Sequence, residues 1–176
     1  GNHVIRMISR EGDEWTVSTI AGPQPTDGST NKQTGFVDGI GASARFYFPR
    51  GLTRDAAGNL YVADMNNSAI RMISQVGDSW QVTTIAGSPP SNGVVTGNTN
   101  GPGPEARFNL PVIVVSSSTG ELYVNESLNK TIRKIHKVDG EWHVSYFSGG
   151  VAGGHSDGQP EDANFFAGIN LAVDPQ

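Results

Sequence analysis

A four-residue block that recurs along the chain constrains its fold more than any other feature. Ile-Arg-Met-Ile begins at Ile5 and again at Ile70, and the variant Ile-Arg-Lys-Ile begins at Ile132, so the spacings are 65 and 62 residues. A tryptophan follows each block at one fixed distance: Trp15, Trp80 and Trp142. Self-similarity at a nearly constant period predicts a repeat architecture, although it does not identify a ligand.

Short segments with strand-like composition recur in each repeat. The first recurs at 51–55, 113–116 and 169–173, and the second at 60–64 and 122–125. The third is the Ile-Arg block, and the fourth starts at each tryptophan and covers 15–20, 80–85 and 142–147. These segments are rich in β-branched and aromatic residues, and Gly, Asn and Asp at the joints favour hairpin turns. A repeated meander of four antiparallel strands predicts all-β propeller blades.

Longer polar segments join one repeat to the next. They run from Gly22 to Pro49, from Gly87 to Pro111 and, in a shorter form, from Gly149 to Gly168. Each contains an Asx-Gly pair followed by Ala-x-Phe, with the phenylalanines at Phe46, Phe108 and Phe165. Loops longer than ~12–15 residues are usually functional or disordered, and recurrence favours order here. We expect each phenylalanine to fill the gap between neighbouring blades.

The repeat resembles the NHL-repeat family of β-propellers. The match lies in Pro-Arg-Gly-Leu at 49–52, in Gly-Asn-Leu-Tyr-Val-Ala-Asp at 58–64, and in Asn67, Ile70 and Arg71. The long form of the repeat, with Val-Thr-Thr-Ile-Ala-Gly and a later Asp-Gly and Ala-x-Phe, looks like the bacterial branch of the family. The resemblance covers almost the whole chain and implies a propeller fold.

The second repeat departs from the family pattern, and the resemblance does not fix a function. Val112-Ile113 stands where the family favours Arg-Gly, and Asn125-Glu126 stands where it favours Ala-Asp. NHL-like propellers include protein-binding and RNA-binding modules, lyases and hydrolases. Because fold does not imply function, the family alone leaves the activity open.

The predicted strands amount to a partial propeller of about 2.75 blades in one domain over 1–176. The parts are an outer half-blade at 1–22, blades at 49–87 and 111–149, and the first strand of a further blade at 168–176. Propellers close with about 4–8 blades, and repeat arrays bury their apolar faces against neighbours. We therefore expect either a longer propeller or closure to a six-bladed ring by a homodimer, the commonest kind of oligomer.

Charge and composition exclude several classes of protein. The net charge is −5, and no run of Lys or Arg occurs, which disfavours a nucleic-acid partner. No apolar stretch approaches the ~20 residues that span a bilayer, so no membrane insertion is predicted. The absence of cysteine excludes disulfides and thiolate metal sites. The bacterial form of the repeat favours the cell envelope or secretion.

The residues that follow the repeat have structural interpretations. Arg6, Arg71 and Arg133 are expected to pair with an acid or a carbonyl of an adjacent strand, as Arg71 would with Asp64, rather than to line a ligand channel, because buried arginines need such partners. The recurring tryptophans are expected to pack in the blade core rather than to bind a sugar.

The linkers hold the candidate binding residues, because loops on a rigid scaffold concentrate binding functions. Asp38, Asn100 and Asp157 occupy equivalent positions, and Asx-Gly is also an ordinary tight turn. His155 is not repeated, and neutral imidazole is both a metal ligand and a base. The predicted channel-face site comprises Asp38, Arg45, Arg50, Asn100, Arg107, His155 and Asp157.

These observations favour a non-catalytic module that binds a peptide, a glycan or a partner protein. No established catalytic or metal motif occurs in the sequence, so no catalytic residue, metal ligand or cofactor is predicted. The alternative is a metal-assisted hydrolase or lyase of the NHL-like type, with a divalent ion such as calcium at the channel centre. The inner-strand ends offer Arg50, Thr53 and Asn170, which are a poor ligand set.

Overall fold

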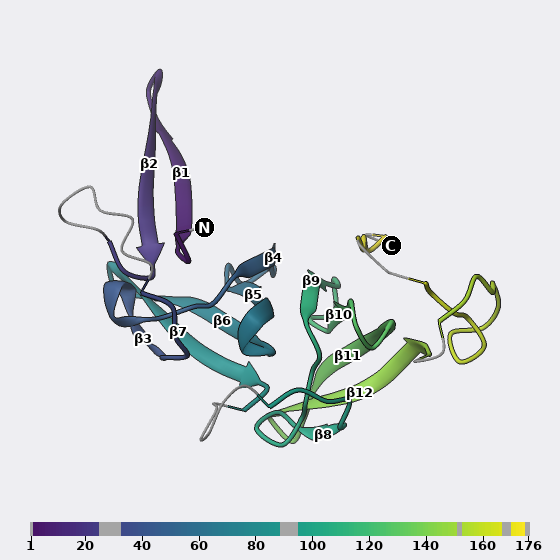
Figure 1. Ribbon diagram of the computed structural model, residues 1–176. Coiled ribbons are helices and arrows are strands. Elements are labelled where there is room, and N and C mark those ends of the chain that lie inside the picture. The colour runs from purple at the N-terminus through teal and green to yellow at the C-terminus, as the bar shows by residue number, and fades with distance from the viewer. Residues whose placement is uncertain (1, 25–32, 89–94, 151–152, 167–169, 175–176) are drawn as a thin grey trace.

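The computed structural model describes residues 2–24, 33–88, 95–150, 153–166 and 170–174. In these ranges every regular element is a β-strand apart from two 3₁₀ turns, and the strands form three antiparallel sheets (Figure 1). No helix in this part of the chain is long and apolar enough to cross a membrane. The sheets follow one another as consecutive blades along an open arc, which confirms the predicted all-β architecture.

The N-terminal sheet, called here the half-blade, is a single hairpin. Strands β1 (Ile5–Glu11) and β2 (Glu14–Ala21) pair antiparallel around a turn that contains Gly12. Gly12 has a φ of 59°, a left-handed conformation that glycine adopts without a steric cost, and Gly77 has the same φ in the equivalent turn of the next sheet. The glycine that recurs in the turn after each Ile-Arg block, at 12, 77 and 140, therefore has a conformational cause.

Blades A and B are five-stranded sheets with the same topology. Blade A has the order β3-β7-β6-β5-β4, with bounds Gly39–Ile40, Ser79–Ala86, Ala69–Val76, Leu60–Asp64 and Pro49–Arg54. Blade B has the order β8-β12-β11-β10-β9, with bounds Gly101–Pro102, Glu141–Gly149, Thr131–Val138, Leu122–Glu126 and Pro111–Ser116. The 3₁₀ turns are η1 (Gly41–Ser43) and η2 (Met65–Asn67). The innermost strands, β4 and β9, are in contact with each other.

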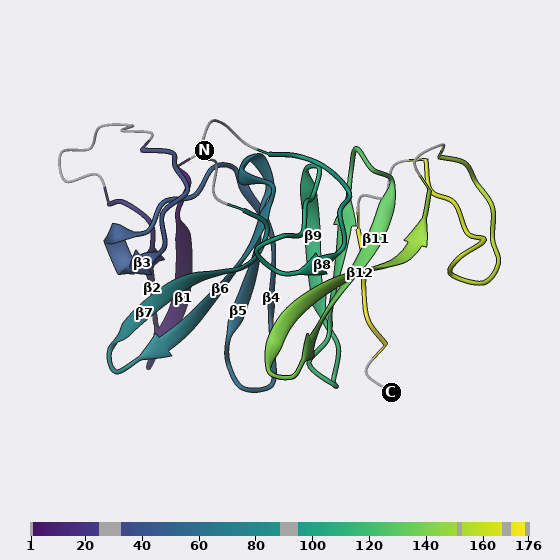
Figure 2. The ribbon, with the colours of Figure 1, turned by 90° about the horizontal axis from the view of Figure 1, so that it is seen from below.

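The connections between strands lie on two opposite sides of the arc (Figure 2). The side here called the linker face carries the segments between blades and the β5–β6 and β10–β11 turns. The side called the hairpin face carries the β4–β5, β6–β7, β9–β10 and β11–β12 turns. This division follows from the meander, because an even number of strand crossings returns the chain to the side from which it started.

The core lies between neighbouring sheets rather than inside one sheet. The cluster between the half-blade and blade A contains Ile5, Ile20, Ala21, Ala44, Phe46, Val62, Ile73 and Val82. The cluster between blades A and B includes Ile70, Ile85, Phe108, Leu122, Val124 and Ile135. Phe46 and Phe108 are both fully buried in these clusters, which confirms for these two linkers that the phenylalanine fills the space between blades. Phe165 of the last linker is half-buried and belongs to neither cluster. Apolar burial of this kind is the main favourable contribution to folding.

Most predicted strands are confirmed to within two residues, and one is not. Residues 170–174 form no strand in the described part of the chain, while Ile169 and the neighbouring 167–168 lie outside the described residues. A strand exists through its hydrogen bonds to a neighbour, and no β-ladder partner of 170–174 occurs among the described residues. The predicted strand at 169–173 is therefore wrong for its described residues.

The structure adds two features that the sequence pattern did not predict. Strands β3 and β8 come from the linkers and pair with β7 and β12 at the outer edge of each blade. Trp15 has 66% of its surface exposed, whereas Trp80 and Trp142 pack against the two clusters. The core prediction fails for Trp15 because no sheet covers that side of the half-blade among the described residues.

Candidate functional site

A buried arginine holds each linker against its blade on the linker face. In blade A, Arg71 donates to Asp64 Oδ2 at 2.8 Å and to Asp38 Oδ1 at 2.6 Å. It also donates to the carbonyls of Val37 and Arg45, at 2.8 and 3.1 Å. The side chains of Arg71 and Asp64 are both fully buried. The predicted pairing of Arg71 with Asp64 is confirmed.

Blade B repeats this network with different residues. Arg133 donates to Glu126 Oε2 at 3.2 Å, to Asn100 Oδ1, and to the carbonyls of Thr99 and Arg107, which are 2.9 and 3.2 Å away. Glu126 thus stands at the position of Asp64 in blade A, and its longer side chain reaches the equivalent guanidinium, that of Arg133. Arg6, in contrast, is exposed and forms no ion pair within the described residues, so its predicted structural pairing is not found.

Burial and charge oppose each other at the two acids of these networks. Burial raises the pKa of Asp64, and the Arg71 charge and the hydrogen bonds from Asn67 and Tyr47 offset part of that rise. Burial likewise raises the pKa of Glu126, and Arg133 offsets part of it. Such a buried pair is costly to break, because one charge then stays in the interior without a partner.

The networks account structurally for the recurrence of the predicted residues Asp38 and Asn100. Asp38 also accepts hydrogen bonds from the Thr84 backbone N–H and hydroxyl, both at 3.0 Å. Its carboxylate therefore ties the linker to the outer strand of blade A. Ligand binding by Asp38 or Asn100 stays a prediction, and each belongs to a different blade.

The remaining predicted residues do not converge on one site. Arg45 donates to the carbonyls of Ala42 and Ala44, and Arg107 donates to those of Pro104 and Ala106, so both guanidiniums close their own turns. Three further residues are exposed, at the start of β4 and in the last linker: Arg50, His155 and Asp157. The His155 ring stacks on Phe166 with centroids 5.8 Å apart.

A cavity of about 230 Å³ lies on the linker face of blade B. Its lining includes the predicted Asn100, together with Asn98, Arg133 and Tyr146. The Arg133 guanidinium and the Asn100 carbonyl oxygen are hydrogen-bonded to each other. This cavity therefore offers few polar groups that are not already paired.

A larger cavity, called here the A–B cleft, opens between the two complete blades at the hairpin face and has a volume of about 590 Å³. Blade A contributes Asp55, Asn59, Tyr61 and Met72. Blade B contributes Thr119, Gly120, Glu121, His136, Lys137 and Trp142. Its size lies within the range of small-molecule sites, and its walls combine aromatic rings with carboxylates, an amide and a hydroxyl.

The acid of the blade A wall is held by three donors. Asp55 accepts hydrogen bonds from the Asn59 backbone at 2.8 Å, from Asn59 Nδ2 at 2.9 Å and from the Tyr61 hydroxyl at 3.0 Å. Burial raises the pKa of Asp55, but the bonds from Asn59 and Tyr61 outweigh it and leave that pKa below its ordinary value. Burial and the Asp55 carboxylate raise the pKa of the Tyr61 hydroxyl, so that hydroxyl stays protonated and keeps donating.

The acid of the blade B wall is held in a similar way. Glu121 lies 2.5 Å from Lys134 Nζ and accepts a hydrogen bond from the Tyr123 hydroxyl at 3.3 Å. The hydrogen bond from Lys134 lowers the pKa of Glu121. Glu121 is therefore ionised and already neutralised by Lys134 on its own sheet.

The two blades carry the acid at different positions of the equivalent turn. Asp55 corresponds to Ser117, and Asn59 corresponds to Glu121. The Ser117 hydroxyl accepts from the Glu121 backbone at 3.1 Å, as Asp55 does from Asn59. The carboxylate moves four residues along the chain, yet each blade keeps an acid in contact with the tyrosine of its Leu-Tyr-Val strand.

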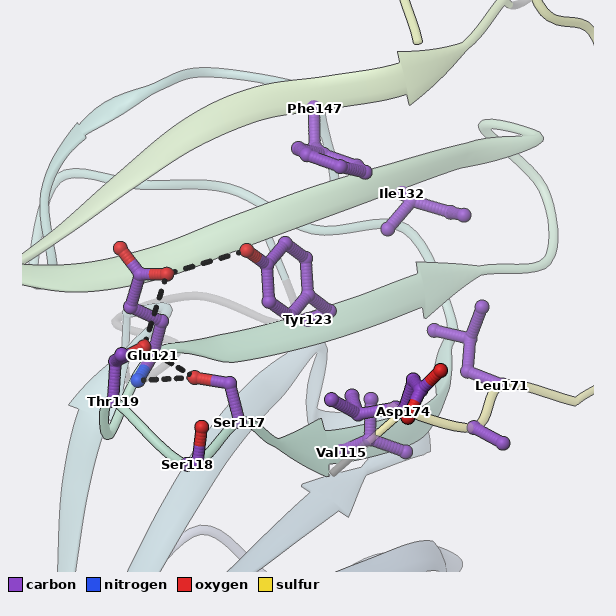
Figure 3. A pocket seen from close by; sticks show the side chains of 12 residues that line it. Val115, Ser117, Ser118, Thr119, Glu121, Tyr123, Ile132, Phe147, Leu171 and Asp174 are labelled. Carbon is purple, nitrogen blue, oxygen red and sulfur yellow. Dashed lines mark hydrogen bonds between the residues drawn. The ribbon is translucent and has the colours of Figure 1, made fainter. Parts of the chain in front are cut away.

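A second cleft of about 410 Å³ lies on the other side of the β9–β10 turn (Figure 3). It is bounded by Ser117, Ser118, Tyr123 and Phe147 and by the segment 171–174. Figure 3 shows the hydrogen-bond chain that links Tyr123, Glu121, Thr119 and Ser117. Thr119 and Glu121 line both clefts, so the turn that carries them separates two neighbouring cavities.

The clefts supply oriented hydrogen-bonding groups. The described residues contain no group of three or more His, Cys, Asp or Glu that could hold a metal ion. Sequence reasoning missed the A–B cleft entirely. The available signal was the recurring Leu-Tyr-Val strand preceded by a turn with one acid, at 55 in one repeat and at 121 in the next.

Comparison with known proteins connects the chain to repeat propellers. No protein-family profile matches it. It is 36% identical over 101 residues to human NHL repeat-containing protein 2, a match that covers 56% of the chain and 13% of that protein.

Several solved structures are similar to the chain. A Bacteroides thetaiotaomicron protein of unknown function matches with a TM-score of 0.60 and 25% identity, and the match covers 81% of the present chain and 30% of that protein. An auxiliary nutrient binding protein from the same species matches with a TM-score of 0.57 and 24% identity, and the match covers 82% of the present chain and 33% of that protein. A protein of that description from Bacteroides ovatus matches with a TM-score of 0.53 and 22% identity, over 72% and 30%. The chain thus spans a third or less of each protein that it resembles.

Proposed function

Because the chain belongs to the NHL-repeat family of β-propellers, we propose that it is a non-catalytic binding module whose ligand enters the A–B cleft. The observation that carries the proposal is the cleft itself. It lies between two complete blades, and both walls present polar side chains beside aromatic rings. Concave sites of this composition are where proteins hold small ligands and short chains.

The solved structures support a binding role at the level of the fold. Two of them are described as auxiliary nutrient binding proteins. A propeller holds its turns on a rigid scaffold, and binding residues concentrate on such turns. The β4–β5 and β9–β10 turns, which carry Asp55 and Thr119, are placed in this way.

The hairpin face is a better location for the ligand than the linker face. On the linker face, Asp38 and Asn100 are hydrogen-bonded to buried arginines, and Arg45 and Arg107 close their own turns. A ligand would have to displace those bonds to use these groups. In the A–B cleft, Lys137 is exposed and forms no ion pair within the described residues, and the exposed Thr119 hydroxyl is bonded only to Ser117 and Glu121 of its own turn.

The proposal is tested by screening the purified chain against arrays of glycans and peptides. Each hit is then measured with Thr119→Ala, which removes a cleft hydroxyl, and with Thr96→Ala, which removes an exposed hydroxyl from a linker. We expect the cleft variant to weaken binding and the linker variant to leave it unchanged. A ligand whose affinity falls only in Thr96→Ala, or in a variant of Asn98, would refute the cleft as the site.

We also propose that the open side of the half-blade is covered by a second copy of the chain. Ile8 and Val17 are 65% and 59% exposed there, whereas their equivalents in blade A, Ile73 and Val82, are fully buried. The half-blade therefore presents to solvent the same kind of apolar surface that blade A buries against its neighbour. Exposed apolar patches of this kind mark interaction surfaces.

A further inference from the structure

We infer that the A–B cleft binds a neutral saccharide chain; this inference rests on the proposed function and names the ligand class of the same site. The cleft contains two carboxylates, from Asp55 and Glu121, which at first sight suggests a cationic ligand. The contacts of those carboxylates, the aromatic wall and the neighbouring cleft argue for a saccharide instead.

Both carboxylates already have hydrogen-bonding or ionic partners within the protein. Asp55 is surrounded by three hydrogen-bond donors, and Glu121 forms an ion pair with Lys134. Lys137 adds a positive charge to the same wall. The two acids therefore act as fixed acceptors, with little net negative charge left to attract an ammonium or guanidinium group. Lone pairs that remain on such carboxylates suit hydroxyl donors.

The remaining polar groups of the cleft offer both donors and acceptors. Thr119 supplies a hydroxyl, Asn59 an amide oxygen, and Lys137 an ammonium group. A sugar hydroxyl donates and accepts at one atom, so a ring with several hydroxyls matches a mixed lining of this kind. A purely cationic side chain has only donors and would leave the Lys137 ammonium without a matching acceptor.

The wall also carries apolar surface that fits the carbon skeleton of a sugar ring. Trp142 and Tyr61 meet edge to face with their centroids 5.9 Å apart, one from each blade. Met72 lies beside them in the lining. The ring carbons of a pyranose are apolar, so the same ligand that satisfies the polar groups can also remove this surface from water.

The neighbouring cleft indicates a chain rather than a single sugar. The β9–β10 turn lies between the two cavities, and its residues Thr119 and Glu121 line both. Ser117 and Ser118 extend the row of hydroxyls into the second cleft, as Figure 3 shows. A ligand with repeated hydroxyl-bearing units can cross this turn and make equivalent contacts on either side.

The test uses three sets of oligosaccharides of equal length: neutral glucans and mannans, acidic oligogalacturonates and basic chitosan fragments. Titration calorimetry measures each set against the unmodified chain, with an array of basic peptides alongside. We expect a neutral oligosaccharide to bind and its affinity to rise from two units to four. Thr119→Ala and Lys137→Gln should each weaken it about 3- to 10-fold, the loss of one hydrogen bond, while Thr96→Ala leaves it unchanged.

The outcomes separate the ligand class from the proposed function. If only chitosan or basic peptides bind, and the cleft variants still weaken them, the saccharide inference is overturned while the cleft stays the binding site. If a neutral oligosaccharide binds but the cleft variants do not affect it, the location is wrong. If no neutral oligosaccharide binds, the inference is overturned. Circular dichroism of each variant shows that a lost affinity does not come from unfolding.

Discussion

Replacing Arg71 with methionine tests whether the buried ion pair holds the linker to blade A. The guanidinium makes four hydrogen bonds, to Asp64, Asp38 and two carbonyls, and its side chain is fully buried. Methionine fills much of the volume but leaves the Asp64 carboxylate buried without its cation. Removing one partner of a buried pair costs about 3–5 kcal/mol. Asp64 keeps its bonds from the Tyr47 backbone and Asn67, so we expect about 3 kcal/mol.

Urea unfolding followed by tryptophan fluorescence measures this loss, since the free energy of unfolding falls linearly with denaturant. A total stability of about 5–15 kcal/mol makes a change of that size easy to resolve. Arg10→Met is the matched control, because the ion pair of Arg10 with Asp13 lies at the surface, where such pairs contribute little. Adding Asp64→Leu to Arg71→Met removes the orphaned charge and should recover part of the loss. A loss in Arg71→Met no larger than in Arg10→Met would refute the reasoning.

Three further predictions follow from other parts of the structure. The pKa of Asp55 lies below 3.8 because hydrogen bonds from Asn59 and Tyr61 outweigh burial, so Asp55 stabilises the fold above that pH and the contribution is lost as the pH falls through the folded-state pKa. Asp55→Asn should flatten this acid limb of the stability curve, and a limb of unchanged steepness would contradict the assignment. Gly51→Ala should destabilise the fold by about 1–3 kcal/mol in urea, because a Cβ there would lie 2.7 Å from both Ile113 Cα and the Val112 carbonyl oxygen; an unchanged midpoint would refute this contact between β4 and β9. Light scattering should give the mass of two chains if a second copy covers the half-blade, and the mass of one well-folded chain would rule that out.

The repeat pattern predicted the strands because the period of each strand and its turn residues are local properties. The strand at 60–64 has the predicted bounds, and the turn glycines adopt the left-handed conformation that their sequence context implies. The pairing of Arg71 with Asp64 followed from the same logic, because a recurring arginine in a buried strand needs an acid.

The features that were missed depend on contacts between segments far apart in the sequence. Strands β3 and β8 are only two residues long and have no periodicity of their own; they exist because the linker returns along the outer edge of its blade. The A–B cleft joins a turn at 55–59 to one at 119–121, and the acid occupies a different turn position in each. Aligning the repeats by residue type hides this exchange, and only the contact of each acid with the equivalent tyrosine, Tyr61 or Tyr123, reveals it.

Trp15, which is exposed, is a second feature that the repeat pattern did not predict. Its position in the repeat predicts burial, and the equivalent Trp80 is partly buried. Burial of a repeat position depends on the neighbouring sheet, however, and no sheet lies against that side of the half-blade among the described residues. Periodicity therefore predicts on which face of its sheet a residue lies, but it does not predict whether another sheet covers that face.

Mapping a bound neutral oligosaccharide by NMR tests the central claim most directly. We expect the largest shift changes at the Trp142 indole N–H and the backbone amides of 119–121 on the blade B wall, and at the Asn59 side-chain amide on the blade A wall. Changes gathered instead around Asn98, Asn100 and Arg133 would place the ligand on the linker face and contradict the account.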